Sequence, residues 1–461
     1  MERTYKFNNV PVARHGVDSQ KMKQEIYNLD IFKSEGDALY VYEADTRIWR
    51  RIPIQQESLE IRKLYKEEDQ SYLDDALLKR IALWLKKHPD LQVNFEEKRN
   101  KYLVCMENGV LDIRNYQFRE VAKEDYCTYV LNAKWLPKAD QQEDNCFNSF
   151  CERVFAKDKA EEKKRMLEVM LGYIFSNLCD AKKALFLIGP TSCGKSVILR
   201  FIGAVLGDEN YSRVGMEQLG ERFSKAELQG KIANIAGEIS AGKISHKSFD
   251  NFKSIVGRDS IQAERKGKDP FNFTFKGKLV FAGNLLPEFS VMDGSEAFIE
   301  RIALLVFNNT IDKRFQDKNI DEKLFEERNV IVSRCLLRMK EFISSGYNFG
   351  MGEDEERMIK QYRESANSVS VFVEAECEIV AEKDCYTVIS ELYDAYIKFT
   401  DSMAVEAEKK SVFRKKLLAV NDKIKLAGKH RVNGGSPRAC FSGIRLKEYD
   451  IKQDTEIGDK G

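Results

Sequence analysis

Residues Gly189–Ser196 read GPTSCGKS and follow the apolar run Ala184–Ile188 directly. A helical pattern of apolar residues follows at Val197, Ile198, Phe201, Ile202 and Val205. A buried strand, a Gly-rich turn and a helix in this order form a phosphate-binding loop, because the backbone N–H groups of the turn point at phosphate oxygens. A lysine adds positive charge and a serine hydroxyl can ligate Mg²⁺. We therefore expect ATP and Mg²⁺ to bind here, at Gly189, Pro190, Thr191, Ser192, Cys193, Gly194, Lys195 and Ser196.

The composition places few other limits on function. The chain has 461 residues, enough for about three domains, and its net charge of +1 means that any nucleic-acid surface must be local. No apolar run reaches membrane-spanning length, and the N-terminus lacks the apolar core of a signal peptide. Ten cysteines are scattered without a CxxC pair, which favours free cytosolic thiols. The four dispersed histidines argue against metal-hydrolase and triad chemistry.

The pattern along the chain predicts four regions. Residues 1–135 form an α+β accessory domain, with a hairpin at Leu39–Glu43 and Arg47–Ile52 and a helix at Ala76–Lys87. Residues 136–183 form a helical collar or oligomerisation segment, in which the helical pattern runs from Asp144 to Asn177. Residues 184–345 form an α/β ATPase core, and residues 346–461 form a C-terminal domain. Asp112 has no second acid two positions away, so we favour a surface turn over a polymerase-type acid pair.

The core requires parallel strands whose ends carry catalytic groups. Its strands are expected at Ala184–Ile188, Ile232–Ala236, Leu279–Ala282 and Ile302–Phe307. Glu238 ends the second strand, where it would polarise the attacking water or hold Mg²⁺, partly through water. Gly237 occupies the position where an aspartate is usual, which leaves Ser196 and water with more of the metal coordination. An ordinary surface acid is the alternative for Glu238.

Two further side chains complete the predicted ATPase centre. Asn284 follows the third strand and could bind both the lytic water and a phosphate oxygen, although Gly-Asn also begins turns. Arg301 precedes the last strand and could act as an arginine finger toward a neighbouring subunit. A local ion pair with Glu296 or Glu300 is the alternative for Arg301.

A basic hairpin is predicted between the strands that end at Glu238 and Asn284. Its tip is Arg265–Lys268, and its strand-like flanks are Ile261–Ala263 and Phe271–Phe275. Packing does not explain projecting lysines at such a tip, whereas contact with a phosphate backbone in a channel does. We expect Lys266 and Lys268 to bind DNA, with a solvated turn as the alternative.

The tail predicts two helices and a hairpin. The helices are Val388–Phe399 and the basic segment Ser411–Val420, and a Gly-containing basic hairpin runs from Lys423 to Ile444. This order suggests a winged helix that contacts DNA, with a solvated cap as the alternative.

The order of these motifs resembles the superfamily 3 helicases, and more closely the poxvirus-type NTPase family that forms the C-terminal half of phage and plasmid primase–helicases. The matching strings are GPTSCGKS, GKIANIAGE, FKSIVGRDSIQAERKGKDPF, KLVFAGNLLP and RIALLVF. The resemblance extends weakly to NGVLDI upstream and to SVSVFVEAECEI and ELYDAYIKF downstream. It implies an AAA+-like core with a winged-helix-like C-terminal domain.

The resemblance also implies residue roles. Lys195 and Ser196 would bind phosphate and Mg²⁺, Glu238 would be the Walker B acid, Asn284 the sensor and Arg301 the finger in trans. Lys253, Gly257 and Asp259 fall in an additional family motif, and Lys266 and Lys268 fall on the DNA-tracking hairpin.

The activity implied is that of an ATP-dependent DNA helicase with 3′–5′ polarity. It would form a homo-oligomeric ring, a hexamer, on single-stranded and forked DNA. It would replicate a phage, plasmid or other mobile genetic element in the cytoplasm of a bacterial host. No paired-acid primase motif is visible, so we expect primer synthesis, or an initiator function, to reside on a separate protein.

Two other functions remain open. The chain could be an initiator or loader ATPase that remodels origin DNA through its basic tail without processive unwinding. It could also be a module whose nucleotide serves only ring assembly, with little hydrolysis, which the missing acid at Gly237 favours.

Overall fold

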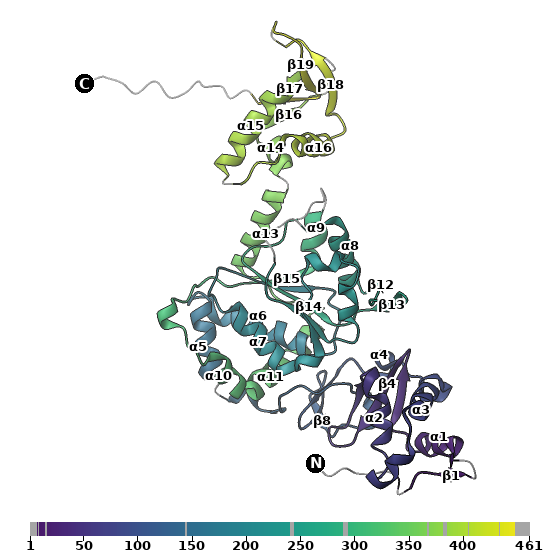
Figure 1. Ribbon diagram of the computed structural model, residues 1–461. Coiled ribbons are helices and arrows are strands. Elements are labelled where there is room, and N and C mark those ends of the chain that lie inside the picture. The colour runs from purple at the N-terminus through teal and green to yellow at the C-terminus, as the bar shows by residue number, and fades with distance from the viewer. Residues whose placement is uncertain are drawn as a thin grey trace. The chain divides into compact units, whose positions relative to one another are not determined.

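The computed structural model describes residues 7, 9–13, 16–142, 145–239, 244–288, 294–366, 368–380, 385–403, 405–432 and 434–447. The chain divides into two compact units (Figure 1). The first unit is made of Met1–Ala241, Lys247–Leu285 and Arg301–Gly352. The second is made of Gly242–His246, Leu286–Glu300 and Glu353–Gly461. The four domain boundaries expected from the sequence stay predictions.

A five-stranded parallel sheet lies at the centre of the first unit, in the order β10-β11-β14-β9-β15. Four strands confirm the predicted segments to within one or two residues: β9 (Ala184–Ile188), β11 (Ala233–Ala236), β14 (Lys278–Gly283) and β15 (Ile302–Val306). All their residues are buried, as is typical of parallel strands that are covered on both faces. The sheet also contains β10 (Tyr211–Ser212), which the sequence did not predict because two residues carry no periodicity.

Two helices cover one face of this sheet, α6 (Ala160–Phe175) and α7 (Lys195–Leu206) (Figure 1). Leu171 of α6 and Ile202 of α7 meet Leu187 of β9 in the main hydrophobic core. Together, α5 (Asn145–Val154) and α6 confirm the predicted helical segment, except that Asp144 lies outside the described residues. The predicted collar is therefore a layer that packs on the parallel sheet, and its role in oligomerisation stays a prediction.

The N-terminal part of the first unit has its own core, two three-stranded antiparallel sheets and the short antiparallel pair β1 (Val12–Ala13) and β2 (Gly16–Val17). In the first sheet, β3 (Phe32–Glu35), β4 (Ala38–Glu43) and β5 (Ile48–Ile52) confirm the predicted hairpin. The second contains β6 (Leu103–Met106), β7 (Gly109–Asp112) and β8 (Gln117–Arg119). The predicted helix is α3 (Asp75–Lys87), which packs beside α1 (Ser19–Asn28) and α2 (Glu57–Arg62).

Asp112, at the end of β7, pairs with Arg114 at 2.6 Å. Hydrogen bonds from Arg114 hold the pKa of this carboxyl below its usual range. The interpretation of Asp112 as part of a surface turn agrees with this local ion pair.

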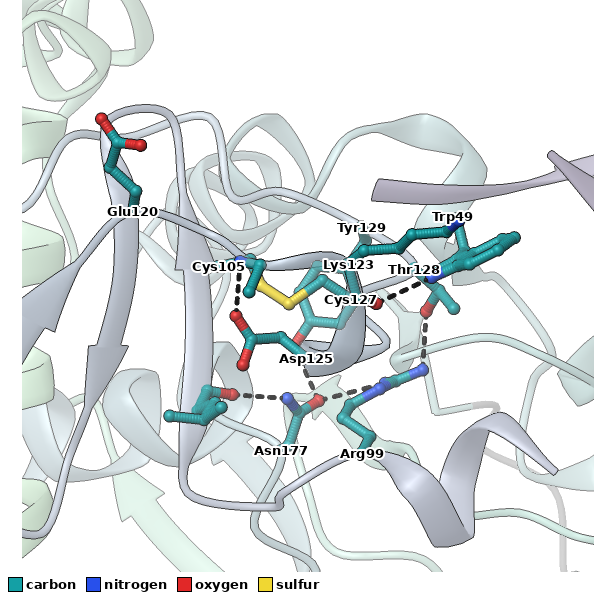
Figure 2. The surroundings of a disulfide bond; sticks show 12 residues. Trp49, Arg99, Cys105, Glu120, Lys123, Asp125, Cys127, Thr128, Tyr129 and Asn177 are labelled. Carbon is teal, nitrogen blue, oxygen red and sulfur yellow. Dashed lines mark hydrogen bonds between the residues drawn. A yellow bond between two sulfur atoms is a disulfide. The ribbon is translucent and has the colours of Figure 1, made fainter. Parts of the chain in front are cut away.

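The expectation that all ten cysteines are free is wrong for Cys105 and Cys127, which form a disulfide. Figure 2 shows this bond beside a hydrogen-bonded group in which Arg99 donates to Thr128 and Asn177. Both cysteines are buried in a small apolar cluster. Cys105 lies on β6, and the carbonyl oxygen of Cys127 accepts a hydrogen bond from the backbone N–H of Trp49 at 2.7 Å. Tertiary packing brings them together over a sequence separation of 22, so no local motif marks the pair.

The C-terminal part of the second unit confirms the expected helices and hairpin. The two expected helices are α15 (Ile389–Ser402) and α16 (Lys410–Val420). Two further helices that the sequence analysis did not predict, α13 (Glu353–Ala366) and α14 (Ser368–Glu376), precede them. The hairpin is formed by β18 (Lys425–His430) and β19 (Arg438–Ser442), with β17 (Tyr386–Val388) on the other side of β19. The strands β16 (Cys377–Ile379) and β20 (Ile444–Leu446) form a separate short antiparallel pair in the same unit.

Candidate nucleotide-binding site

The loop between β9 and α7 has a backbone that two glycines make possible. A Cβ atom on Gly189 would lie 2.3 Å from the carbonyl oxygen of Phe307. Gly194 has φ 96°, and a Cβ atom there would lie 2.7 Å from Val154. A side chain at either position would therefore clash, and at Gly194 it would also be strained. Glycine at these two positions of the loop thus has a steric cause in this chain.

Lys195 begins α7 and is 9% exposed. Its ammonium group donates to the carbonyl oxygens of Gly189 at 2.6 Å and Pro190 at 2.7 Å. Within the described residues, the backbone N–H groups of Thr191, Ser192, Cys193 and Gly194 have no hydrogen-bond acceptor. The loop thus combines a cation with a run of available N–H donors, which is the chemistry that binds a polyphosphate.

Asn284 lies next to this loop. The N–H of Gly189 donates to the carbonyl oxygen of Gly283 at 3.2 Å, which fixes the end of β14 against the start of the loop. The amide oxygen of the following residue, Asn284, is 3.5 Å from the Lys195 ammonium nitrogen. The structure therefore brings the predicted sensor and the loop lysine together.

Glu238 lies at the same edge of the sheet, one strand further away. Ala236 pairs with Phe281, so Glu238 comes level with Gly283. Its side chain is exposed and makes no ion pair or hydrogen bond with a described residue. A Cβ atom on Gly237 would have its nearest neighbour at 3.7 Å, an ordinary contact with Leu199, so the absence of an aspartate there is not a steric necessity.

Arg301 is not brought to this edge. It precedes β15, and its carbonyl oxygen accepts the N–H of Ala184 at the start of β9. Because β15 and β9 are parallel, the five residues of β15 separate Arg301 from the level of the loop by roughly 16 Å. Arg301 is therefore remote from the loop of its own chain.

The predicted hairpin is formed by β12 (Ser260–Ala263) and β13 (Phe271–Thr274). Two polar contacts brace its tip: Arg222 forms a two-point ion pair with Glu264, at 2.7 and 2.8 Å, and Arg265 donates to Gln229 at 2.8 Å. Lys266 and Lys268 are exposed on either side of Gly267, which has φ 74°. The tip thus presents two lysines from a braced support.

The residues of the additional family motif lie at the end of α8 (His246–Gly257) and just after it. Lys253 forms an ion pair with Asp250 at 2.8 Å. The N–H of Asp259 donates to the carbonyl oxygen of Ser254 at 2.9 Å, which closes the turn after Gly257. These contacts give this motif a local structural role between α8 and the hairpin.

The sequence did not single out two further features, one at the loop and one at the opposite end of β14. The N–H of Ile311, in the segment after β15, donates to the carbonyl oxygen of Ser192 in the loop at 2.9 Å. Lys278, the first residue of β14, is 1% exposed and donates to the carbonyl oxygen of Ser176. Burial, with a smaller effect of Arg258, lowers the pKa of Lys278 to about 7. A lysine inside an apolar strand was a usable signal for the second feature, whereas the first has no local signal.

Two family models match parts of the chain. Residues 27–156 match the model described as D5 N terminal like, and residues 187–301 match a family of unknown function (DUF5906). The chain is also 25% identical over 238 residues to "Putative helicase L207/L206" of Acanthamoeba polyphaga mimivirus. The match covers 50% of this chain and 24% of that protein, so the chain spans about a quarter of the relative's length.

Solved structures show a similar fold. An A-form apo structure of the NrS-1 C-terminal region has a TM-score of 0.50 at 10% identity, covering 91% of this chain and 98% of that one. Another apo structure of the same region has the same score and identity and covers 92% and 99%. This similarity shows a shared mixed α/β fold with a parallel sheet. Among the described helices, none has the length and apolar content of a membrane span.

Proposed function

We propose that the chain is an ATP-dependent DNA helicase of superfamily 3, with an AAA+-like core that assembles into a hexameric ring and moves 3′–5′ on single-stranded or forked DNA. The observation that carries this proposal is the convergence of Lys195, Asn284 and Glu238 at one edge of the sheet. The similarity to a viral protein named as a helicase supports the same class of function, as does the hairpin with its lysine tip.

Each residue has a definite task in hydrolysis. The N–H groups of the loop would bind the β- and γ-phosphates, and Lys195 would exchange its loop carbonyl partners for phosphate oxygens. Asn284 would orient the attacking water, and Glu238, whose carboxylate has no partner among the described residues, would accept its proton. Ser196 and Glu238 offer the hydroxyl and carboxylate oxygens that Mg²⁺ prefers, with water filling its remaining positions. Mg²⁺ would neutralise charge on the phosphates.

Arg301 would act on the nucleotide of a neighbouring subunit. Its distance from the loop of its own chain supports a role in trans over a role in cis. A heterologous, head-to-tail ring interface would supply this arrangement at every subunit.

The first experiment measures ATP hydrolysis with and without single-stranded DNA. We expect DNA to stimulate the wild-type enzyme, and Lys195→Ala to abolish turnover in both conditions. The double variant Lys266→Ala/Lys268→Ala should keep the DNA-free rate and lose the stimulation, while Lys87→Ala, an exposed lysine at the end of α3, serves as control. Negligible wild-type turnover in both conditions would reject the helicase and favour nucleotide-gated assembly.

A mixing experiment tests the ring. Lys195→Ala retains a finger but lacks a working loop, and Arg301→Ala retains the loop but lacks the finger. If Arg301 acts in trans, each active site combines the loop of one subunit with the arginine of its neighbour. In an equal mixture that assembles at random, about a quarter of the interfaces pair an intact loop with an intact arginine, so about a quarter of the wild-type rate should return. No recovery in mixed oligomers would contradict the role in trans.

The second unit favours one further candidate, an origin-binding initiator. The exposed residues of α16 include Lys410, Arg414 and Lys415, and the exposed residues of the adjoining hairpin include Lys425 and Lys429. A winged helix places a helix and a hairpin on duplex DNA in this manner, so the basic surface could bind a defined sequence. Preference for one duplex in competition with random duplex, lost when residues after Ser365 are removed, would support the initiator.

A further inference from the structure

A cavity of about 460 Å³ lies beside the loop, in the first unit. It is lined by residues from the end of α5 and from the segment after β15, namely Arg153, Thr310, Ile311, Asp312 and Phe315. Its size is within the range of roughly 300–1,000 Å³ that small-molecule sites in proteins have.

Both walls of this cavity touch the loop. On one side, the N–H of Ile311 donates to the carbonyl oxygen of Ser192 at 2.9 Å. On the other side, Arg153 is followed by Val154, whose side chain closes the space around Gly194. The cavity therefore adjoins the phosphate-binding loop on both sides.

Phe315 is the aromatic residue of this cavity and is 70% exposed. It ends the short turn Lys313–Phe315, in which the Asp312 carboxylate accepts the N–H of Arg314 at 2.9 Å and the Asp312 carbonyl accepts the N–H of Phe315 at 2.9 Å. The Arg314 guanidinium pairs with the same carboxylate at 2.7 Å and lies 5.8 Å from the centre of the Phe315 ring. The turn thus holds an exposed aromatic ring at the rim of the cavity.

The lining determines what kind of group the cavity can bind. An aromatic ring stacks on flat π systems of any base. The Asp312 carboxylate is already occupied by Arg314, so polar contacts to a base edge or ribose would come from the Thr310 hydroxyl and the Arg153 guanidinium. A flat heterocycle with polar edges therefore matches this lining.

We propose that this cavity, the base pocket, holds the base of the nucleotide whose phosphates bind at Gly189–Ser196, and that Phe315 stacks on that base. The proposal rests on the proposed nucleotide-binding function. Because a purine offers a larger stacking face than a pyrimidine, the pocket should favour purine nucleotides.

The test compares ligands with and without a base on the full-length chain. Dissociation constants of ATP, CTP and inorganic tripolyphosphate are measured by calorimetry in the presence of Mg²⁺. Phe315→Ala should weaken ATP binding about tenfold, the factor that corresponds to about 1.4 kcal/mol, and should leave tripolyphosphate binding unchanged. Phe315→Trp should keep the preference for ATP over CTP. The control Tyr72→Ala removes another exposed aromatic ring and should change neither constant.

The outcomes separate this proposal from the proposed function. Lys195→Ala should weaken both ATP and tripolyphosphate. If the wild-type chain binds neither ligand, the nucleotide site itself is wrong, and the base pocket with it. If it binds both but Phe315→Ala leaves the ratio of their dissociation constants unchanged, the base pocket is wrong while the phosphate site stands.

Discussion

The ammonium nitrogen of Lys195 lies 3.5 Å from the amide oxygen of Asn284, although 89 positions separate the two residues in the sequence. The contact follows from the order of the strands, because β14 lies between β9 and β11. The end of β14 is therefore next to the loop that follows β9. The order of parallel strands thus converts three distant sequence motifs into one site, and it gives Asn284 the place closest to the loop.

The first prediction concerns Asn284. Replacement of Asn284 by alanine should lower the kcat of ATP hydrolysis about 100-fold, because a group that orients the reacting water acts chiefly in the transition state. The dissociation constant of ATP should change by less than about threefold, since the loop retains its N–H donors and Lys195. Single-turnover hydrolysis and equilibrium ATP binding measure the two effects. The control is Asn319→Ala, because Asn319 is exposed and makes no side-chain capping hydrogen bond. An unchanged kcat for Asn284→Ala would show that Asn284 has no part in hydrolysis.

The second prediction concerns Gly237, which precedes the proposed catalytic acid. A Cβ atom at this position has its nearest neighbour at 3.7 Å, so aspartate should be accepted without loss of stability. A carboxylate there would add a direct oxygen ligand, and we expect the Mg²⁺ concentration for half-maximal hydrolysis to fall severalfold in Gly237→Asp. Gly237→Ala, which adds the Cβ atom without the carboxylate, should behave as the wild type. An unchanged Mg²⁺ requirement in Gly237→Asp would show that this strand end does not face the metal.

The core strands could be predicted because the parallel sheet is buried on both faces. Each of β9, β11, β14 and β15 is consequently rich in apolar residues, which a sequence displays directly. The first three are followed by Gly189, Gly237 and Asn284. The loop was equally visible, since its glycines are sterically required.

Other features depend on contacts that leave no local trace. The strand β10 has two residues, too few for any period. The hydrogen bond from Ile311 to Ser192 uses only backbone atoms, so no residue type signals it. The pairing of Cys105 with Cys127 depends on how β6 packs against the segment after β8. Contacts of this kind therefore account for the parts of the fold, and for the one contact at the loop, that the sequence did not reveal.

The third prediction concerns the buried Lys278 at the start of β14. Its pKa is lowered to about 7 in the folded chain, against about 10.4 for an unperturbed lysine. Between these values the unfolded chain binds a proton that the folded chain does not, so the stability of the wild type should rise with pH, by at most about 1.4 kcal/mol per pH unit from this group. Below pH 7, Lys278 is protonated in the folded chain as well, and the buried charge lowers the free energy of unfolding by its full amount.

The matching variant is Lys278→Met, which keeps the length of the side chain without its charge. Urea unfolding at pH 6.5, 8 and 9.5 should show the variant more stable than the wild type at pH 6.5, with a difference that shrinks as the pH rises. Lys87→Met, at an exposed position, should show no such trend. A difference between Lys278→Met and wild type that is constant over this range would mean that Lys278 does not titrate there.

The fourth prediction concerns the disulfide between Cys105 and Cys127. A cross-link over a separation of 22 residues restricts the unfolded chain, and in the chain-entropy account it contributes about 3 kcal/mol to the free energy of unfolding. Addition of reductant to the unfolding reaction should lower that free energy by about this amount in the wild type and by nothing in Cys105→Ser/Cys127→Ser. Thiol titration of the denatured, non-reduced chain should count the eight free cysteines and not all ten. Ten reactive thiols would show that the two sulfur atoms pack together as thiols, and the effect of reductant on stability should then disappear.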